Sequence, residues 1–148
     1  MTKITPYQRN IHYYETDQMA IVHHSNYIRF LEECRMYYME QWGIPYEKIE
    51  AAGILIPVLG VHVKYKQAIR FGDTIEISQR ITRFSQVKFA VEYEIRNAKT
   101  QELHAIGSSE HAFVDSKLAP VRLKKDYPEI YTALSSCFDS GRAEPCME

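Results

Sequence analysis

YIRFLEECRMYYMEQW, residues 27–42, carries the strongest helical pattern of the 148-residue chain. Its apolar and aromatic side chains recur every three or four residues, and this spacing predicts an amphipathic helix with one buried stripe. The stripe consists of Tyr27, Phe30, Leu31, Cys34, Tyr38 and Trp42. Ser25 or Asn26 is suited to cap the start of this helix. Gly43 and Pro45 mark its end.

On both sides of this helix, apolar and polar residues alternate, which is typical of strands. Short turns, among them Phe71-Gly72-Asp73 and residues 97–101, link the later strands and predict an antiparallel meander. The helical stripe is the large apolar surface available to cover such a sheet. The expected strands are residues 8–15, 58–68, 75–82, 87–96 and 103–114.

These elements predict an α+β fold, an antiparallel sheet curled around one long helix. A chain of this length fits a single domain, which we place at residues 1–135. The sequence after Asp139 (Ser-Gly-Arg-Ala-Glu-Pro) is typical of disorder. We therefore expect residues 136–148 to form a disordered C-terminal tail.

The bulk composition argues against several classes of protein. The chain carries 18 basic and 19 acidic residues, a net charge of -1, so the charge balance does not indicate a nucleic-acid partner. No segment approaches the roughly 18 apolar residues of a membrane span, and no signal peptide is evident. Three cysteines without a CxxC spacing and six histidines without an HxxxH pair argue against a disulfide framework and a metal site. We expect a cytoplasmic protein without membrane insertion or a bound metal.

The loop YYETDQMAIVHHSNY, residues 13–27, carries the groups that acyl transfer requires. Strand alternation continued into this loop places Tyr13, Glu15 and Asp17 on one side. The loop then brings His24 to a helix N-terminus, whose free amides stabilise an oxyanion while a carboxylate attacks or activates water. The plainer interpretation is that Asp17 only shapes a turn and that the histidines are solvated. The GxSxG, P-loop and GxGxxG motifs of other enzyme classes do not occur in the sequence.

The spacing YxxxDxxxxVxHxxY resembles the signature of the 4-hydroxybenzoyl-CoA thioesterase family, in particular its YbgC-like acyl-CoA thioesterase branch. The matching positions are Tyr13, Asp17, Val22, His24 and Tyr27. The similarity extends over residues 8–120. It implies the hotdog fold, which agrees with the layout that periodicity predicts.

The resemblance implies a role for each matching site residue. Asp17 would be the catalytic carboxylate, and His24 and Tyr13 would position water or substrate. Many relatives have small residues, often glycine, after the aspartate, whereas this chain has Gln-Met-Ala at residues 18–20, which bears on the shape of the acyl pocket. A thiol leaves readily because its pKa is about 8.5, so the reaction needs no cofactor.

For coenzyme A, the resemblance points to the predicted turn at residues 83–88. Arg83 and Lys88 would meet phosphates, and Ser85 would bond to the pantetheine arm. The alternative is that basic residues at a hairpin turn serve solubility alone.

The resemblance also implies a homodimer or homotetramer with active sites between protomers. The expected activity is hydrolysis of an acyl-CoA, or of an acyl-carrier-protein thioester, to a free acid and a thiol. A hotdog hydratase or dehydratase and a non-catalytic acyl-CoA-binding protein are the alternatives. The sequence leaves open the acyl group, the choice between CoA and carrier protein, and whether Asp17 is nucleophile or general base.

Overall fold

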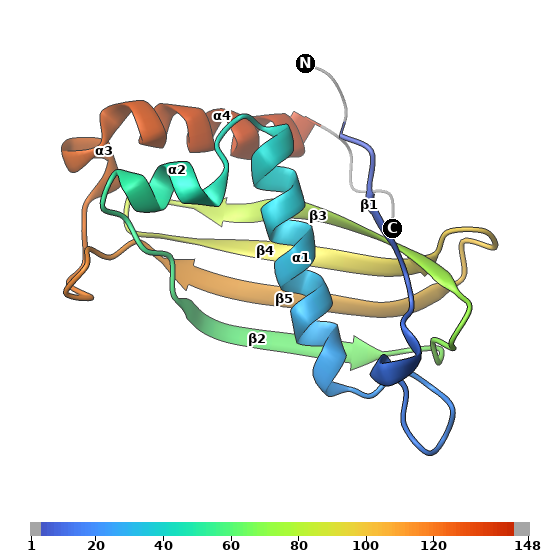
Figure 1. Cartoon of the computed structure of the whole chain (residues 1–148). Coiled ribbons are helices and arrows are strands. Elements are labelled where there is room, and N and C mark those ends of the chain that lie inside the picture. Colours follow the sequence, from blue (N-terminus) through green and yellow to red (C-terminus); the bar gives the residue numbers. More distant parts are fainter. Residues whose placement is uncertain (1–3, 144–148) are drawn as a thin grey trace.

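Residues 4–143, which the computed structural model describes, form one antiparallel sheet of five strands with a long helix lying across one face (Figure 1). The spatial order of the strands is β1-β3-β4-β5-β2. This arrangement confirms the expected α+β hotdog fold. The strands are β1 (Tyr7–Asn10), β2 (Val58–Tyr65), β3 (Thr74–Phe84), β4 (Lys88–Asn97) and β5 (Leu103–Ala112). The helices are α1 (Ser25–Gln41), α2 (Tyr46–Ala51), α3 (Leu123–Asp126) and α4 (Pro128–Ala143), with the 3-10 turn η1 (Tyr13–Glu15).

The meander prediction is confirmed for β3, β4 and β5, which pair in sequence order, and is wrong for β2. Strand β2 pairs with β5, where Val63 lies opposite Gly107. The reason is the path of residues 66–73, which cross the end of the sheet and are held there by the Lys66 N–H donating to the His104 carbonyl. The free side of β3 is taken by β1. Strands β1 and β2 are therefore the two edges of the sheet.

Helix α1 buries the apolar stripe that periodicity predicts. Phe30, Leu31 and Cys34 are fully buried and belong to one core cluster with Ile77 of β3. Gly107 of β5 permits the helix to come this close, because a Cβ there would lie 3.2 Å from Leu31 Cδ1 and 3.3 Å from a carbonyl of β2. Burial raises the pKa of the Cys34 thiol far above its usual value, so Cys34 is a packing residue and not a nucleophile.

The C-terminal segment differs from the disordered tail expected after residue 135. Helix α4 crosses that boundary, so residues 136–143 are helical, and residues 144–148 lie outside the described part of the chain. The reason is an apolar stripe: Leu134 and Cys137 are buried in the core. Tyr131 and Phe138 pack against Phe84 of β3, with ring centroids 5.6 Å and 6.2 Å apart. A helix with such a stripe gains stability by packing on the sheet.

Candidate active site

The chain between β1 and α1 turns back and does not continue as a strand. Strand β1 ends at Asn10, so the strand expected to reach Glu15 is wrong beyond that point. The Glu15 carboxylate accepts a 2.8 Å hydrogen bond from the His12 N–H and so closes the turn η1. As a result Glu15 is 5% exposed and Tyr13 is 75% exposed. The expectation that Tyr13, Glu15 and Asp17 share one side is therefore wrong.

Asp17 begins a tight loop that is closed by its own hydrogen bonds. The Asp17 N–H donates to the Ile21 carbonyl at 2.9 Å, and the Asp17 carbonyl accepts from the Ala20 N–H at 2.9 Å. Oδ1 of Asp17 also accepts from the Met19 N–H at 2.8 Å. The other carboxylate oxygen, Oδ2, has no hydrogen-bond partner within residues 4–143. Asp17 therefore shapes a turn, as the plainer interpretation held, and Oδ2 takes no part in closing that turn.

Asp17 and His24 line the same pocket, which has a volume of about 220 Å³. Tyr13 is not one of its lining residues, because its ring lies edge-on against Phe71 with centroids 5.6 Å apart. The structure thus brings together two of the three residues expected to act in catalysis. The other walls are Met19, Ile21, Val22 and Tyr27, with residues 65–68 at the end of β2 and after it.

The N-terminus of α1 borders this pocket with fewer free amides than the sequence predicts. Ser25 is the first helical residue and His24 precedes it, so neither Ser25 nor Asn26 is the N-cap. The Ser25 N–H donates to Nδ1 of His23 at 3.1 Å, and the next two amides donate to loop carbonyls. The His24 N–H has no acceptor among the described residues. It is therefore an amide available to an oxyanion, at the positive end of the helix dipole.

The neighbouring ring of His23 supports His24. Nδ1 of His23 accepts the Ser25 N–H at 3.1 Å and lies 2.9 Å from the Ser25 hydroxyl oxygen, so the first residue of α1 holds this ring in place. The rings of His23 and His24 stack with centroids 4.2 Å apart and an interplanar angle of 28°. This contact restricts the orientation of the His24 imidazole beside the pocket.

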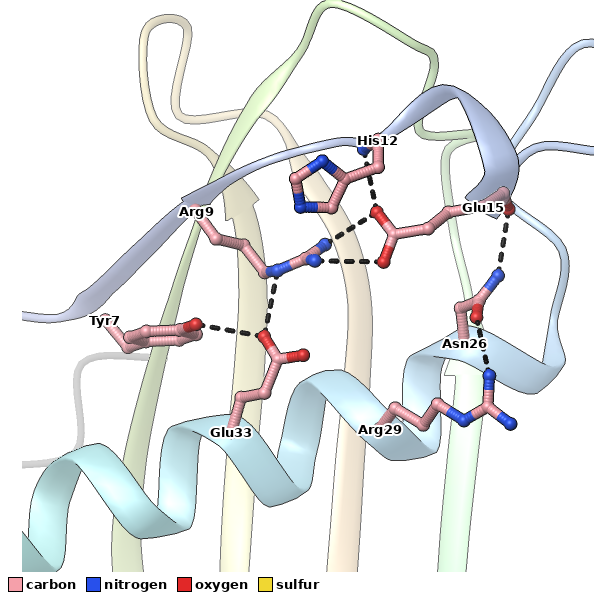
Figure 2. A network of polar contacts seen from close by, with 7 residues as sticks. All are labelled: Tyr7, Arg9, His12, Glu15, Asn26, Arg29 and Glu33. Carbon is pink, nitrogen blue, oxygen red and sulfur yellow. Dashed lines mark hydrogen bonds and ion pairs between the residues drawn. The ribbon is translucent and has the colours of Figure 1, made fainter.

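A partly buried polar network ties the loop to β1 and α1 (Figure 2). Arg9 of β1 donates two hydrogen bonds of 2.9 Å to Glu15 and contacts Glu33 of α1 at 2.8 Å. Burial alone would raise the pKa of the Glu15 carboxyl, but the bonds from Arg9 and from the His12 amide hold it below its usual value. Sequence reasoning missed this role of Glu15. The available signal was an acid two residues before Asp17, with Arg9 on the preceding strand.

The residues expected to bind CoA lie at the far end of the sheet from this pocket. The turn between β3 and β4 is beside α2 and α3, whereas the Asp17 loop lies beyond the other end of the sheet (Figure 1). Arg83 forms a 2.9 Å ion pair with Glu110. The Ser85 hydroxyl accepts from the Val87 and Lys88 amides and donates to the Lys88 carbonyl, so it shapes the turn. A single chain does not bring Arg83, Ser85 or Lys88 to Asp17.

Two absences hold for the part of the chain that the structure describes. No three His, Cys, Asp or Glu side chains there gather closely enough to hold a metal ion. None of the helices in that part has the length and apolar character needed to cross a membrane.

The sequence model of the thioesterase-like superfamily matches residues 11–134. The chain belongs to the thioesterase-like superfamily. One relative from Bacillus subtilis (strain 168), named "Putative acyl-CoA thioesterase YneP", is 32% identical over 124 residues, which cover 83% of this chain and 89% of that protein. The crystal structure of the DHNA-CoA thioesterase from Staphylococcus aureus superposes with a TM-score of 0.87 at 28% identity, covering 96% and 95% of the two chains. A third superfamily relative, the acyl-acyl carrier protein thioesterase ATL3 of Arabidopsis thaliana, is 26% identical over 112 residues, 74% of this chain and 58% of that protein.

Proposed function

We propose that the protein hydrolyses an acyl-CoA thioester and that Asp17 supplies the carboxylate. The observation that carries this proposal is the pocket that Asp17 and His24 both line at the N-terminus of α1, where the His24 N–H has no acceptor among the described residues. Membership of the thioesterase-like superfamily and the names of its relatives support thioester hydrolysis. We place the chain in the YbgC-like acyl-CoA thioesterase branch on the motif formed by Asp17 and His24.

Two routes use the same atoms. As a nucleophile, an oxygen of Asp17 forms a bond to the thioester carbon, the C–S bond breaks, and the thiolate leaves and takes up a proton; water then cleaves the mixed anhydride. As a general base, Asp17 takes a proton from a water molecule that attacks the same carbon. In both routes the His24 N–H would donate to the developing oxyanion. The thiol, with a pKa of about 8.5, leaves without a strong acid.

A second copy of the chain would complete the site. Strand β2 is a sheet edge with exposed Val58, Leu59, Val61 and Tyr65, and such an edge is suited to pairing with its own copy. In a two-fold antiparallel pair, the Tyr65 end of one β2 lies beside the Val58 end of the other. Val58 lies opposite His111, and His111 lies opposite Phe89 at the β3–β4 turn. The pairing would carry Arg83, Ser85 and Lys88 of one copy toward the Asp17 pocket of the other.

The assembly, the cellular location and the role of Tyr13 are further parts of this proposal. The assembly would be a homodimer or a homotetramer of such pairs. The protein would act in the cytoplasm, where three cysteines without a disulfide framework are suited to a reducing compartment. Tyr13 would contact the substrate arm or the second copy, because its exposed ring is free to be covered.

Release of thiol from a panel of acyl-CoAs tests the activity. We expect wild-type protein to release thiol and Asp17→Asn to be at least about 100-fold slower with an unchanged fold. Consumption of an enoyl-CoA without thiol release would favour a hydratase. Binding of acyl-CoA without turnover would favour a non-catalytic role. Parallel assays with an acyl-carrier-protein thioester decide between the two carriers.

A further inference from the structure

Glu15 is a buried carboxylate, two residues before Asp17, that the proposed chemistry does not use. Its Oε1 accepts from Nη1 of Arg9 at 2.9 Å and from the His12 N–H at 2.8 Å, and its Oε2 accepts from Nη2 of Arg9 at 2.9 Å. Because both oxygens are engaged and Glu15 does not line the pocket, it is placed neither to attack a substrate nor to exchange a proton with one. Its contacts instead join segments of the chain.

The backbone of Glu15 makes the second set of these contacts. Its carbonyl accepts from the His23 N–H at 2.9 Å and from Nδ2 of Asn26 in α1 at 2.9 Å. The side chain of Glu15 therefore attaches the loop to β1, and its carbonyl attaches the first turn of α1 through Asn26 (Figure 2) and the returning segment of the loop through His23. One residue thus fixes both ends of the segment that carries Asp17 and His24.

The loop beyond Glu15 is closed at its base, because the Asp17 N–H donates to the Ile21 carbonyl and Thr16 bridges to Val22. We infer that the Glu15–Arg9 pair is a positioning device that sets where the Asp17 carboxylate and His24 lie across the pocket. This inference rests on the proposed role of Asp17. Displacement of a reacting group by about 1 Å is enough to lower a rate by about 100-fold. A small shift of Glu15 would therefore lower kcat more than it lowers the unfolding free energy.

Arg9 provides a matched control for this test, because it binds two carboxylates, one from the loop (Glu15) and one from α1 (Glu33). Its Nε contacts Glu33 at 2.8 Å, and its guanidinium lies 4.4 Å from the centroid of the Phe30 ring. Glu33 belongs to α1, and its other hydrogen-bond partner among the described residues is the Tyr7 hydroxyl of β1, so Glu33 does not hold the loop. Glu15→Gln and Glu33→Gln each remove one negative charge from the same guanidinium. Only Glu15→Gln alters a side chain that holds the loop.

The experiment measures kcat and KM for thiol release together with the unfolding temperature of each variant. We expect Glu15→Gln to lower kcat at least about tenfold with KM within about twofold of wild type. We expect Glu33→Gln to keep kcat within about threefold, because the loop keeps its anchor. Arg9→Lys keeps the charge but cannot form the paired bonds, so its kcat should lie between those of wild type and Glu15→Gln. It also provides the test if Glu15→Gln does not fold.

Three outcomes overturn the inference: wild-type kcat in the folded Glu15→Gln or Arg9→Lys variant, a loss confined to KM, or equal losses of kcat in the Glu15 and Glu33 variants. The Asp17→Asn protein separates this failure from that of the proposed function. If wild type releases no thiol, the proposed function fails. If wild type is active, Asp17→Asn is inactive and Glu15→Gln matches wild type, only the positioning role fails.

Discussion

The backbone N–H of Met19 donates a 2.8 Å hydrogen bond to Oδ1 of Asp17, so the carboxylate proposed for catalysis also closes its own loop. Asp17→Asn keeps an oxygen that accepts this bond, whereas Asp17→Ala loses it. We expect both variants to lose at least about 100-fold in kcat, but only the alanine variant to lose about 1 kcal/mol of unfolding free energy. Urea denaturation and thiol release measure the two effects. Equal destabilisation of both variants would show that the bond does not hold the loop.

Ala20 occupies a left-handed backbone conformation, with φ of 63°, in the same loop. This region costs a residue with a Cβ about 1–2 kcal/mol, and glycine avoids that cost at the expense of about 0.4–1 kcal/mol of extra unfolded-chain entropy. We expect Ala20→Gly to raise the unfolding free energy by about 0.5 kcal/mol. Ala51→Gly, at the exposed last position of helix α2 where φ is not strained, is the control and should not raise the unfolding free energy, because glycine is less favourable than alanine in a helix. A loss of stability in both variants would contradict the strain at position 20.

His111 predicts a pH dependence of folding. Its ring is buried, with Nε2 2.7 Å from the Ser109 hydroxyl. Burial, aided by the charge of Arg35, lowers its pKa from 6.5 to about 4. The unfolded chain therefore binds a proton at higher pH than the folded protein, so stability falls as pH drops below 6.5 and this loss levels off near pH 4.

Urea denaturation of wild type and His111→Leu at several pH values checks this dependence. The variant should lose less stability between pH 6.5 and pH 4 because it has no ring to protonate there. Glu15 acts in a lower window: its pKa is held below 4.5, so its contribution is lost only as pH falls through that lower range. The same slope in both proteins above pH 4.5 would exclude His111 as the cause.

The exposed edge of β2 predicts the assembly. Val61 lies in the middle of this edge strand, and a two-fold pair would place identical charges close together in Val61→Asp. We expect light scattering to give a mass of at least two chains for wild type and of one chain for Val61→Asp. Thiol release should then fall at least about tenfold, because the turn of the second copy no longer reaches the pocket. Leu118→Asp, at an exposed apolar position outside β2, should change neither quantity.

The sequence predicts those helices and strands whose buried side shows as a regular spacing of apolar residues. The stripe from Tyr27 to Trp42 predicts α1, and alternation predicts the β3–β5 meander, because each pattern states which side faces the core. The pairing of β2 with β5 is not local. The pairing depends on how residues 66–73 cross the end of the sheet and on the hydrogen bond from Lys66 to His104. The alternating pattern of β2 would be the same whether this strand paired with β3 or with β5, so the pattern does not predict the partner.

The candidate site divides in the same way. The spacing of Asp17 and His24 in the motif is visible in the sequence, and both line the pocket. The position of Tyr13 could not be predicted from the sequence, because the turn η1 interrupts the strand alternation on which that prediction depended. The role of Glu15 depends on which polar groups it pairs with in the folded loop, and that of the His24 N–H on its being left unpaired there. That property belongs to the tertiary structure.

Because the Asp17–Ile21 loop is closed at its base, changes of side chain at its tip are separate from changes in the position of Asp17. Residues 18–20 form the tip, and Met19 is a pocket wall, whereas the bonds that hold Asp17 come from backbone groups, including the Met19 N–H and the Ile21 carbonyl. Side-chain substitutions at the tip that keep this backbone path would reshape the pocket and leave the Asp17 carboxylate, which we propose to be catalytic, in place. Under the proposed function, a lineage with this loop would diversify the acids it releases through single replacements at the tip.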